Sequence, residues 1–558
     1  MNTRSLAPTA VLVLTAAVYL PALSFGFVCD DSQQIVDSQP RYVWSALPSF
    51  FTTDVWHYTD FIDSNYYRPG FLLWLFLNSQ LFGLNTVLWH AAAIALHLAA
   101  TLLFYFLARR LVDDPLIAGA AALLFGVHPA HIEAVAWLSG VTESLLAVFF
   151  LGALLAYLSG RRTAALLLFA AAIFTKETAI VLPLLLAACD WFFPPAAAAS
   201  PRQRLRAALR TLAACACIVL LYLPLRLHAL GSLAPLVRAW TPRMLLGTLP
   251  SAGLFYLRQL LLPIQYSLFY PIAPIATFGW SQTILPVLVI ALFLLLLYGL
   301  ARLSRAFAFA ALLLVVPLLP VFNFRAFAFD DFQHDRYLYL PSAGLCLVIA
   351  LAAARFLRSP AVRIAALAAL CAAFAYANLQ FSGYWADNLS LYTHASQVAP
   401  ESDIAAEYLG GELLAQQRFA DALPLFQKVL FHDGRMSIYE NLAMCYLGLD
   451  DYSRASAFLS QTMTLFPRAH EPHFFMAQLY QRQGQLSEAE AEARQALRLR
   501  PEASPVLAKY HGRLASILAD ENQYPAALAE YQQELKENPF AQEARDAIEQ
   551  LRARGVTP

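Results

Sequence analysis

Charged residues are scarce in this 558-residue chain: Asp, Glu, Lys and Arg together make up 14% of it, against about 25% in a typical soluble domain. Its seven cysteines include no CxxC pair and no zinc-finger spacing, and we interpret Cys215 and Cys217, in an apolar run, as small buried hydrophobes. The sequence also lacks a P-loop, a dinucleotide-binding fingerprint and a GxSxG elbow, which argues against cytosolic nucleotide chemistry. A plain soluble enzyme, a disordered chain and a collagen-like fibre are therefore excluded.

The charge that is present is divided unevenly along the chain. Residues 1–400 carry 23 Lys and Arg against 16 Asp and Glu, whereas residues 401–558 carry 15 against 22. The net charge of zero thus hides a basic, apolar part followed by an acidic, polar part. This division argues against general nucleic-acid binding and indicates a membrane part joined to a soluble part.

Eleven apolar runs in the first part approach the roughly 20 residues that one membrane-spanning helix needs. The first, residues 6–28, has one upstream Arg and no small-residue cleavage site, so we predict a retained span rather than a signal peptide. The others lie near 84–108, 115–128, 143–159, 163–175, 178–193, 210–225, 283–301, 305–322, 340–355 and 362–380. We predict an all-α fold: a polytopic helical bundle over residues 1–385, a linker at 386–400, and a helical repeat domain at 401–558.

Arginines orient the predicted spans. They gather in five connections, at 109–110, 161–162, 202–210, 302–305 and 355–363, which all lie in the cytoplasm if the N-terminus is inside. The external side then holds the segments 28–83, 128–143, 175–178, 226–282 and 322–339, and after eleven spans the repeat domain. The run 245–262 contains Pro250 and Arg258, so we predict a re-entrant or interfacial helix; if it spanned, the C-terminus would be inside.

Residues 401–558 repeat with a period near 34. Pro467 and Pro501 are 34 residues apart, Pro539 follows after 38, and an alanine stands 12 residues before each of them. This is the period of tetratricopeptide repeats, in which small residues lie where two helices cross and Pro ends the second helix. We predict four repeats and a closing helix at 541–554, forming a groove that binds an extended peptide or another protein.

Asp30 and Asp31 follow the first span directly. A carboxylate at this border can accept a proton from a hydroxyl group, and a neighbouring one can position the acceptor or a cation. The alternative is a hydrophilic end to the span without a chemical role.

Three further polar residues stand at the outer end of the third run, in the sequence HPAHIEAVAW. His128 and His131 are three residues apart, which places them on one face of a helix, and Glu133 follows. They could bind a divalent metal, orient a carboxylate, or lie at the interface without a further role. The order differs from the zinc-protease HExxH motif, because the Glu lies beyond the second His.

Cations also occur at the external border. Lys176 lies beside Glu177 in the turn FTKET, and Glu143 opens the predicted span 143–159. Arg336 lies in NFRAFAFDDFQHDRYLYLP, directly after His334 and Asp335, and Arg68 lies in NYYRP. An Arg at a membrane border can grip a lipid phosphate through paired N–H donors, or it can anchor the interface together with tyrosines.

Taken together, these blocks resemble the transmembrane and tetratricopeptide-repeat O-mannosyltransferases and their bacterial relatives, in the GT-C superfamily. The resemblance rests on CDDSQQIVDS, NYYRPGFLLWLFLNSQLFGLN, HPAHIEAVAWLSGVTESLLA, FTKETAIVLPLLLAACDWF and HDRYLYLPSAGL, and on YWADNLSLYTHASQVAP before the repeats. The order and spacing of these blocks carry it more than any single block.

The resemblance implies an inverting glycosyltransferase whose site lies on the external face. The donor would be a sugar on a polyprenyl phosphate, of the undecaprenyl or dolichyl type, and the acceptor a protein Ser or Thr hydroxyl. Asp30, in the family's acidic pair with Asp31, would be the base, and Arg336, with Arg68 or Lys176, would hold the phosphate. His128, His131, Glu133, Glu143, His334 and Asp335 complete the set of candidates, with a divalent metal as a further option.

Many bacterial relatives carry an Arg where this chain has Val141; if that Arg serves the donor phosphate, another residue must bind the phosphate here. The alternatives to protein glycosylation are transfer to an envelope glycan or lipid, and a non-catalytic membrane scaffold. The Ala-, Leu- and Arg-rich composition favours a bacterial inner membrane with the repeats in the periplasm. The predicted partners are the bilayer, the lipid-linked sugar and an acceptor protein held by the repeats.

Overall fold

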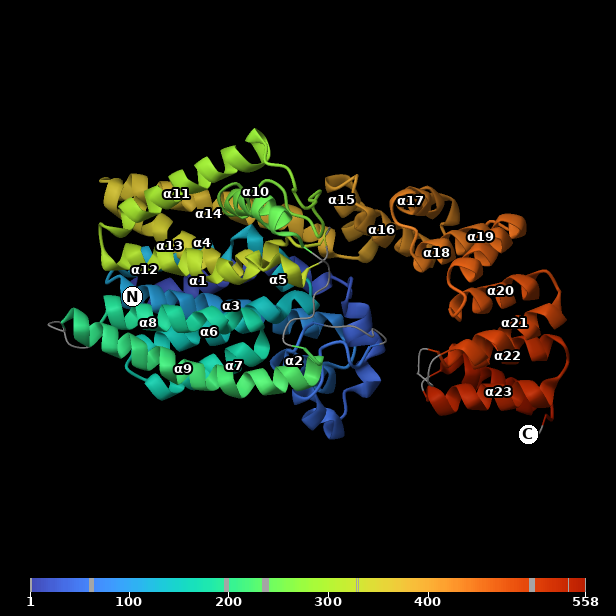
Figure 1. Ribbon diagram of the computed structural model, residues 1–558. Helices are drawn as coiled ribbons and strands as arrows, with labels where there is room; N and C mark the ends of the chain where they lie inside the picture. Colours follow the sequence, from blue (N-terminus) through green and yellow to red (C-terminus); the bar gives the residue numbers. More distant parts are fainter. Residues whose placement is uncertain are drawn as a thin grey trace. The chain divides into compact units, whose positions relative to one another are not determined.

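The structure is a computed structural model that describes residues 3–59, 65–194, 200–232, 240–327, 329, 331–500, 507–539 and 541–556. Within these residues every regular element is a helix, so the all-α prediction is confirmed. The chain divides into two compact units, Met1–Val398 and Ala399–Pro558, which Figure 1 shows coloured from blue to orange and from orange to red.

The first unit contains fifteen α-helices within the described residues. They are α1 Thr3–Tyr19, α2 Pro69–Phe82, α3 Thr86–Leu111, α4 Pro115–Gly126, α5 Ile132–Ala136, α6 Thr142–Leu158, α7 Arg162–Thr175, α8 Leu182–Phe192, α9 Pro201–Leu230, α10 Pro242–Leu261, α11 Leu285–Ala301, α12 Arg305–Val315, α13 Tyr339–Phe356, α14 Pro360–Ser382 and α15 Asn388–Val398.

Short polar residues begin many of these helices. Asn85, Ser304 and Ser359 accept hydrogen bonds from backbone N–H groups in the first turns of α3, α12 and α14. Ser200 begins α9 with a reciprocal capping box to Gln203. Such caps satisfy N–H groups that have no partner inside the helix, so each of these four helices begins at a defined residue.

Eight helical stretches of the described chain are long and apolar enough to cross a bilayer, and nine if the bent pair Pro115–Gly126 and Pro129–Ala136 is one span. The first unit is therefore multi-pass, but the predicted count of eleven is not confirmed. The predicted runs at 115–128, 163–175 and 178–193 form α4, α7 and α8, which have 12, 14 and 11 residues. At 1.5 Å per residue, 14 residues extend only about 21 Å, less than the ~30 Å hydrocarbon core.

The region 226–282 holds one long helix, α10, which contains Pro250 and covers the predicted run 245–262. The chain from Pro263 to Gly279 has no regular helix, and it leads into a short π-helix at Trp280–Ile284. The predicted linker, 386–400, contains the helix α15.

Close helix packing builds the interior of this unit. Helix α6 packs between α3 and α7, and α9 lies against α7 and α8 (Figure 1). Where α13 crosses α12, there is no room for a β-carbon at Gly344, because the backbone of Leu314 and Ala310 occupies that space. Small residues at such crossings let helix backbones approach closely in a membrane, where packing rather than the hydrophobic effect drives association.

The second unit consists of four antiparallel helix pairs and a closing helix. They are α16 Asp403–Ala415 with α17 Phe419–His432, α18 Met436–Gly448 with α19 Tyr452–Leu465, α20 Glu471–Arg482 with α21 Leu486–Leu499, α22 Lys509–Asp520 with α23 Tyr524–Glu537, and α24 Gln542–Ala553. The predicted repeats and closing helix are confirmed; Pro501, used to establish the period, lies outside the described residues.

The repeats share a backbone feature that their side chains do not reveal. The turn inside each pair contains one residue with positive φ: Gln417 at 59°, Asp450 at 57°, Gly484 at 74° and Asn522 at 61°. The predicted small residues Ala455, Ala489 and Ala527 are fully buried. The period is therefore conserved in backbone geometry even where the residue in the turn differs.

Candidate active site

Side-chain contacts bring together the segments predicted to lie on the external side. The Asn65 amide donates to the Ala326 carbonyl at 2.9 Å, and Arg226 donates to the Asn65 carbonyl at 3.1 Å. Gln259 donates to Asp335 at 2.8 Å. These contacts, with the ion pairs below, connect residues from 28–83, 128–143, 175–178, 226–282 and 322–339 into one polar region.

Two of the arginines predicted to lie in the cytoplasm bond to neighbouring helices. Arg110, at the end of α3, donates to the Leu158 carbonyl at the end of α6, with NH2 at 3.2 Å. Arg162, at the start of α7, pairs with Asp190 of α8 at 3.1 Å. These contacts join the end of α3 to the end of α6 and the start of α7 to α8.

Asp31 is fully buried, and its carboxylate accepts hydrogen bonds from neighbouring segments of the chain. The N–H and hydroxyl groups of Ser139 donate to one carboxylate oxygen at 2.7 and 2.6 Å. The N–H group of Val28 donates to the other oxygen at 3.2 Å. Burial raises the pKa of Asp31 to about 7, against the lowering effect of these hydrogen bonds. Asp31 thus fastens the loop after the first span to the 139–141 turn.

Asp30 is different, because the residue is only partly buried and its side chain accepts a weak hydrogen bond, from the Cys29 thiol at 3.6 Å. Burial raises the pKa of Asp30 to about 6, while the Cys29 thiol and the positive charge of Arg336 act in the opposite direction. Of the acidic pair, Asp30 is the carboxylate that combines access, a pKa near neutrality and a neighbouring cation, which suits a general base.

Arg336 and Glu133 form a buried ion pair beside Asp30. The Arg336 guanidinium pairs with one Glu133 oxygen, and the Arg336 backbone N–H donates to the other at 2.8 Å. The guanidinium also lies over the rings of Trp137 and Tyr337, 5.2 and 5.1 Å from their centres. His334 adds a neighbour, with Nδ1 3.8 Å from Glu133. These contacts fix the orientation of the guanidinium.

Lys176 also lies close to Tyr337. Its ammonium pairs with Glu143 and lies 5.2 Å from the centre of the Tyr337 ring. Burial lowers the pKa of Lys176, and the positive charges of Arg68 and Arg336 lower it further. The negative charge of Glu143 acts in the opposite direction and raises it. The three predicted phosphate-binding cations are thus close enough to influence one another.

Arg68 forms the third ion pair of this region, with Glu177. Its Nε and NH2 groups donate to the two carboxylate oxygens at 3.1 and 2.6 Å, and the guanidinium lies 4.3 Å from the centre of the Tyr66 ring. Burial alone would raise the pKa of Glu177, but Arg68 and Lys176 lower it to about 2. This pair therefore stays ionised throughout the workable pH range.

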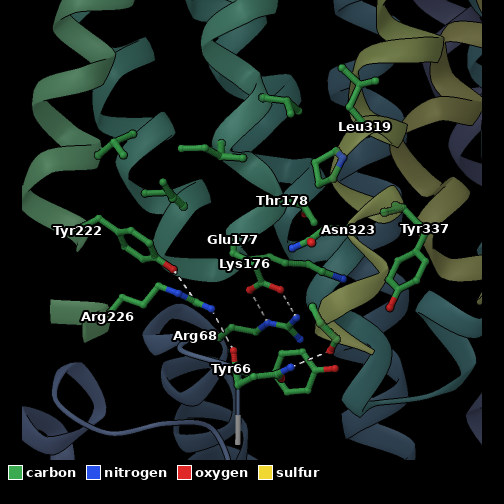
Figure 2. A pocket seen from close by; sticks show the side chains of 18 of the residues that line it. Tyr66, Arg68, Lys176, Glu177, Thr178, Tyr222, Arg226, Leu319, Asn323 and Tyr337 are labelled. Carbon is green, nitrogen blue, oxygen red and sulfur yellow. Dashed lines mark hydrogen bonds and ion pairs between the residues drawn. The ribbon is translucent and has the colours of Figure 1, made fainter. Parts of the chain in front are cut away.

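A cavity of about 530 Å³ opens beside these cations. Figure 2 shows Tyr66, Arg68, Lys176, Glu177 and Arg226 gathered at one end, and Leu319 at the other. The apolar part of its lining comes from α7, α9 and the segments 180–181 and 319–321: Ile173, Ile180, Val181, Val219, Leu223, Leu319, Pro320 and Val321. Ile180 and Leu319 are 45% and 51% exposed, so the apolar end reaches the surface of the helical bundle.

Arg226 is a cation of this cavity that the sequence analysis missed. It lies near the C-terminal end of α9 and donates to the Tyr222 hydroxyl at 3.4 Å and the Asn65 carbonyl at 3.1 Å. The sequence does carry a signal, because Arg226 directly follows the predicted span 210–225 and an ionisable residue at or near membrane depth is a functional candidate.

The histidines at 128 and 131 are core residues rather than ligands. His128 donates to the Leu260 carbonyl at 3.2 Å and accepts from the Ala130 N–H at 3.1 Å, and His131 bonds to the Ser342 hydroxyl at 2.8 Å. Both are fully buried. Among the described residues no group of three or more His, Cys, Asp or Glu is placed to hold a metal ion, so the residues predicted for a divalent metal do not fit one.

Asp335 also has a connecting role. Its two oxygens accept from Gln259 at 2.8 Å and from the Tyr270 hydroxyl, which joins the end of α10 and the following loop to the segment before α13. Val141 is fully buried in an apolar cluster that includes Phe71 and Trp74, so this position supplies no cation.

Comparison with known proteins shows similarity to one named group. Protein O-mannosyl-transferase F38B6.6 of Caenorhabditis elegans is 26% identical over 405 residues, covering 70% of this chain and 57% of that protein. Protein O-mannosyl-transferase TMTC3 of Mus musculus is 33% identical over 155 residues, and Tmtc1 of Drosophila melanogaster is 36% identical over 152; each alignment covers 27% of this chain and 17% of the relative.

The repeat unit matches independently. The tetratricopeptide repeat family profile matches residues 470–502, which contain α20 and α21. These similarities confirm the resemblance predicted from the sequence blocks and the presence of tetratricopeptide repeats. The chain spans about half the length of the first of these relatives and about a sixth of the other two.

Proposed function

We propose that this chain is an integral-membrane glycosyltransferase that moves a sugar from a polyprenyl phosphate to Ser or Thr hydroxyls of proteins. The observation that carries the proposal is the two-ended cavity, with Arg68, Lys176 and Arg226 at one end and an apolar, surface-reaching wall at the other. A phosphate with a long hydrocarbon tail is the chemical class that matches both ends. The names of the relatives make mannose the first sugar to test.

In the proposed reaction Asp30 accepts the proton of the acceptor hydroxyl. The hydroxyl oxygen forms a bond to the anomeric carbon of the donor while the bond from that carbon to the phosphate oxygen breaks. The electron pair of the broken bond leaves on the polyprenyl phosphate, whose growing charge Arg68, Lys176 and Arg226 stabilise. One displacement from the opposite face inverts the anomeric centre.

The neighbouring groups would hold this geometry. Glu133 and Trp137 orient Arg336, which keeps a positive charge beside Asp30. The Tyr337 ring lies near both Arg336 and Lys176 and lines the cavity, so it connects the proposed base to the proposed phosphate site. Asp31 acts through Ser139 as a fastening for the loop.

The surroundings of the site follow from the same proposal. The repeats would hold the acceptor protein, which favours protein over glycan or lipid acceptors. In a bacterial inner membrane the cation-lined end and the repeats would face the periplasm, and the donor would be undecaprenyl-linked. No metal is assigned a role here.

Arg226→Ala tests the cavity as the donor site. The variant should raise the KM for polyprenyl-phosphate mannose by about tenfold, because one charge-assisted hydrogen bond to phosphate contributes roughly 1.5–3 kcal/mol, and should change the acceptor KM little. Transfer is followed by intact mass of a Ser/Thr-containing acceptor. Arg243→Ala, an exposed arginine in the first turn of α10, is the matched control. Equal donor KM for both variants would contradict the assignment.

A further inference from the structure

The backbone at Cys29 takes an unusual conformation directly before Asp30. Its φ is 54°, in the left-handed region that side chains with a β-carbon seldom adopt. It is one of four non-glycine residues with positive φ among the described residues, and the other three lie in turns of the repeat unit. A residue is held there only when its surroundings favour it.

Helix α15 supplies the contacts that hold Cys29. The Asn388 side-chain carbonyl, in the first turn of α15, accepts from the Cys29 backbone N–H at 2.8 Å. Tyr392, one turn further on, interacts with the Cys29 thiol, and residues four apart lie on the same face of a helix. The Cys29 thiol in turn donates to the Asp30 carboxylate at 3.6 Å.

The segment before α15 makes parallel contacts with the same region. The Gly26 N–H donates to the Ala386 carbonyl at 2.9 Å, and Trp385 stacks on Trp137 with ring centres 6.1 Å apart. Trp137 is the ring on which the Arg336 guanidinium lies. The stretch 385–392 therefore contacts both the loop that carries Asp30 and the support of the cation beside it.

We propose that Asn388 is a positioning residue for Asp30: it holds Cys29 in the left-handed conformation, which directs Asp30 toward Arg336 while Asp31 bonds to Ser139. The proposal rests on the function proposed above for Asp30, but its geometric part stands independently. Asn388 begins an Asn-Leu-Ser triplet that would otherwise be read as a glycosylation sequon. Its carbonyl oxygen is already engaged with the loop.

The kinetic test compares Asn388→Ala in two backgrounds. In the natural chain the variant should lower kcat about tenfold, the effect of one lost hydrogen bond of about 1–1.5 kcal/mol, with the donor KM unchanged. In the Cys29→Gly background the same change should lower kcat less than about threefold, because Gly adopts positive φ readily and needs no partner to hold it. Ser390→Ala is the matched control, since Ser390 bonds within its own turn to Asp387.

Equal losses of kcat in both backgrounds, or no loss in either, would overturn the positioning role. Cys29→Ala, which keeps the β-carbon and removes the thiol, separates the contribution of the thiol contact from that of the backbone.

A second measurement is independent of activity. Of the seven cysteines, Cys29, Cys217 and Cys371 are not buried; Cys217 is exposed, so its interpretation as a buried hydrophobe was wrong. Cys217→Ser with Cys371→Ser therefore leaves Cys29 as the accessible thiol. Adding Asn388→Ala should raise the rate of Cys29 alkylation by N-ethylmaleimide at least about threefold, because the loop is released, and Ser390→Ala should leave it unchanged. An unchanged rate in Asn388→Ala overturns the inference even if no transfer is detected; a raised rate without transfer supports the geometry and refutes the proposed function alone.

Discussion

Asp30→Asn and Asp31→Asn should have opposite consequences although the two residues are neighbours. Asn cannot accept the hydroxyl proton, so Asp30→Asn should lower kcat by about 10²–10⁴, the usual contribution of a general base. Its thermal unfolding should hardly change, because Asp30 makes one weak contact. Asp31→Asn replaces one of the two accepting oxygens with an NH2 group that cannot accept, so the bonds from Ser139 or the bond from Val28 are lost, which should cost about 1–3 kcal/mol of stability.

The pH dependence of transfer tests the same assignment in the natural chain. Burial raises the pKa of Asp30 to about 6, and the base acts only when deprotonated. The carboxylate is then about nine-tenths ionised at pH 7 and about one-tenth at pH 5, whereas an ordinary Asp would stay more than about nine-tenths ionised at both. Transfer should therefore fall about tenfold between pH 7 and pH 5.

The assay is initial-rate transfer from polyprenyl-phosphate mannose, with thermal unfolding measured on the same preparations. Asp113→Asn, an exposed carboxylate beyond the end of α3, controls for the loss of one negative charge. Asp30→Asn with more than a tenth of natural activity, or a rate that is flat from pH 5 to pH 7, would refute the assignment of the base.

Three further results are expected. Lys176→Met should destabilise the membrane unit by about 3–5 kcal/mol and make it aggregate, since the change leaves Glu143 charged and buried. Adding Glu143→Leu should restore a monodisperse peak in size-exclusion chromatography. A double variant that still aggregates would contradict a simple ion pair. Gly344→Val should abolish monodisperse protein, because the added atoms collide with the backbone of α12, and a normal elution profile would show that this crossing is looser than described. Gln417→Gly should stabilise its repeat by roughly 1 kcal/mol by relieving positive φ, seen as slower proteolysis within residues 399–558 of the intact chain, and faster proteolysis would count against it.

Local sequence patterns predicted much of this architecture. The 34-residue period depends on contacts between neighbouring helices, so it predicted the repeats and the closing helix α24 without tertiary information. Apolar runs located the helices of the membrane unit for a similar reason. Length was harder, because α4, α7 and α8 end at turns that satisfy packing within the bundle, and hydropathy alone does not show where those turns fall.

The sequence indicated which residues belong to the site better than it indicated what each of them does. Charged residues at membrane depth are costly, which singled out Lys176 and Arg336 correctly as members of one polar region. The difference between Asp30 and Asp31 depends on Ser139, more than 100 residues away, and no local pattern reveals that contact. His128 resembled a ligand in sequence because the carbonyl that it bonds belongs to the distant α10.

The central claim is that the donor is a lipid-linked sugar, and the direct measurement compares two donors with one acceptor. The purified full chain in lipid nanodiscs receives either polyprenyl-phosphate mannose or a nucleotide-linked mannose, and the acceptor is analysed by intact mass and fragmentation. The account predicts added hexose on Ser or Thr with the lipid-linked donor and none with the nucleotide-linked donor. Transfer from the nucleotide-linked donor, or no transfer from the lipid-linked one, would contradict it.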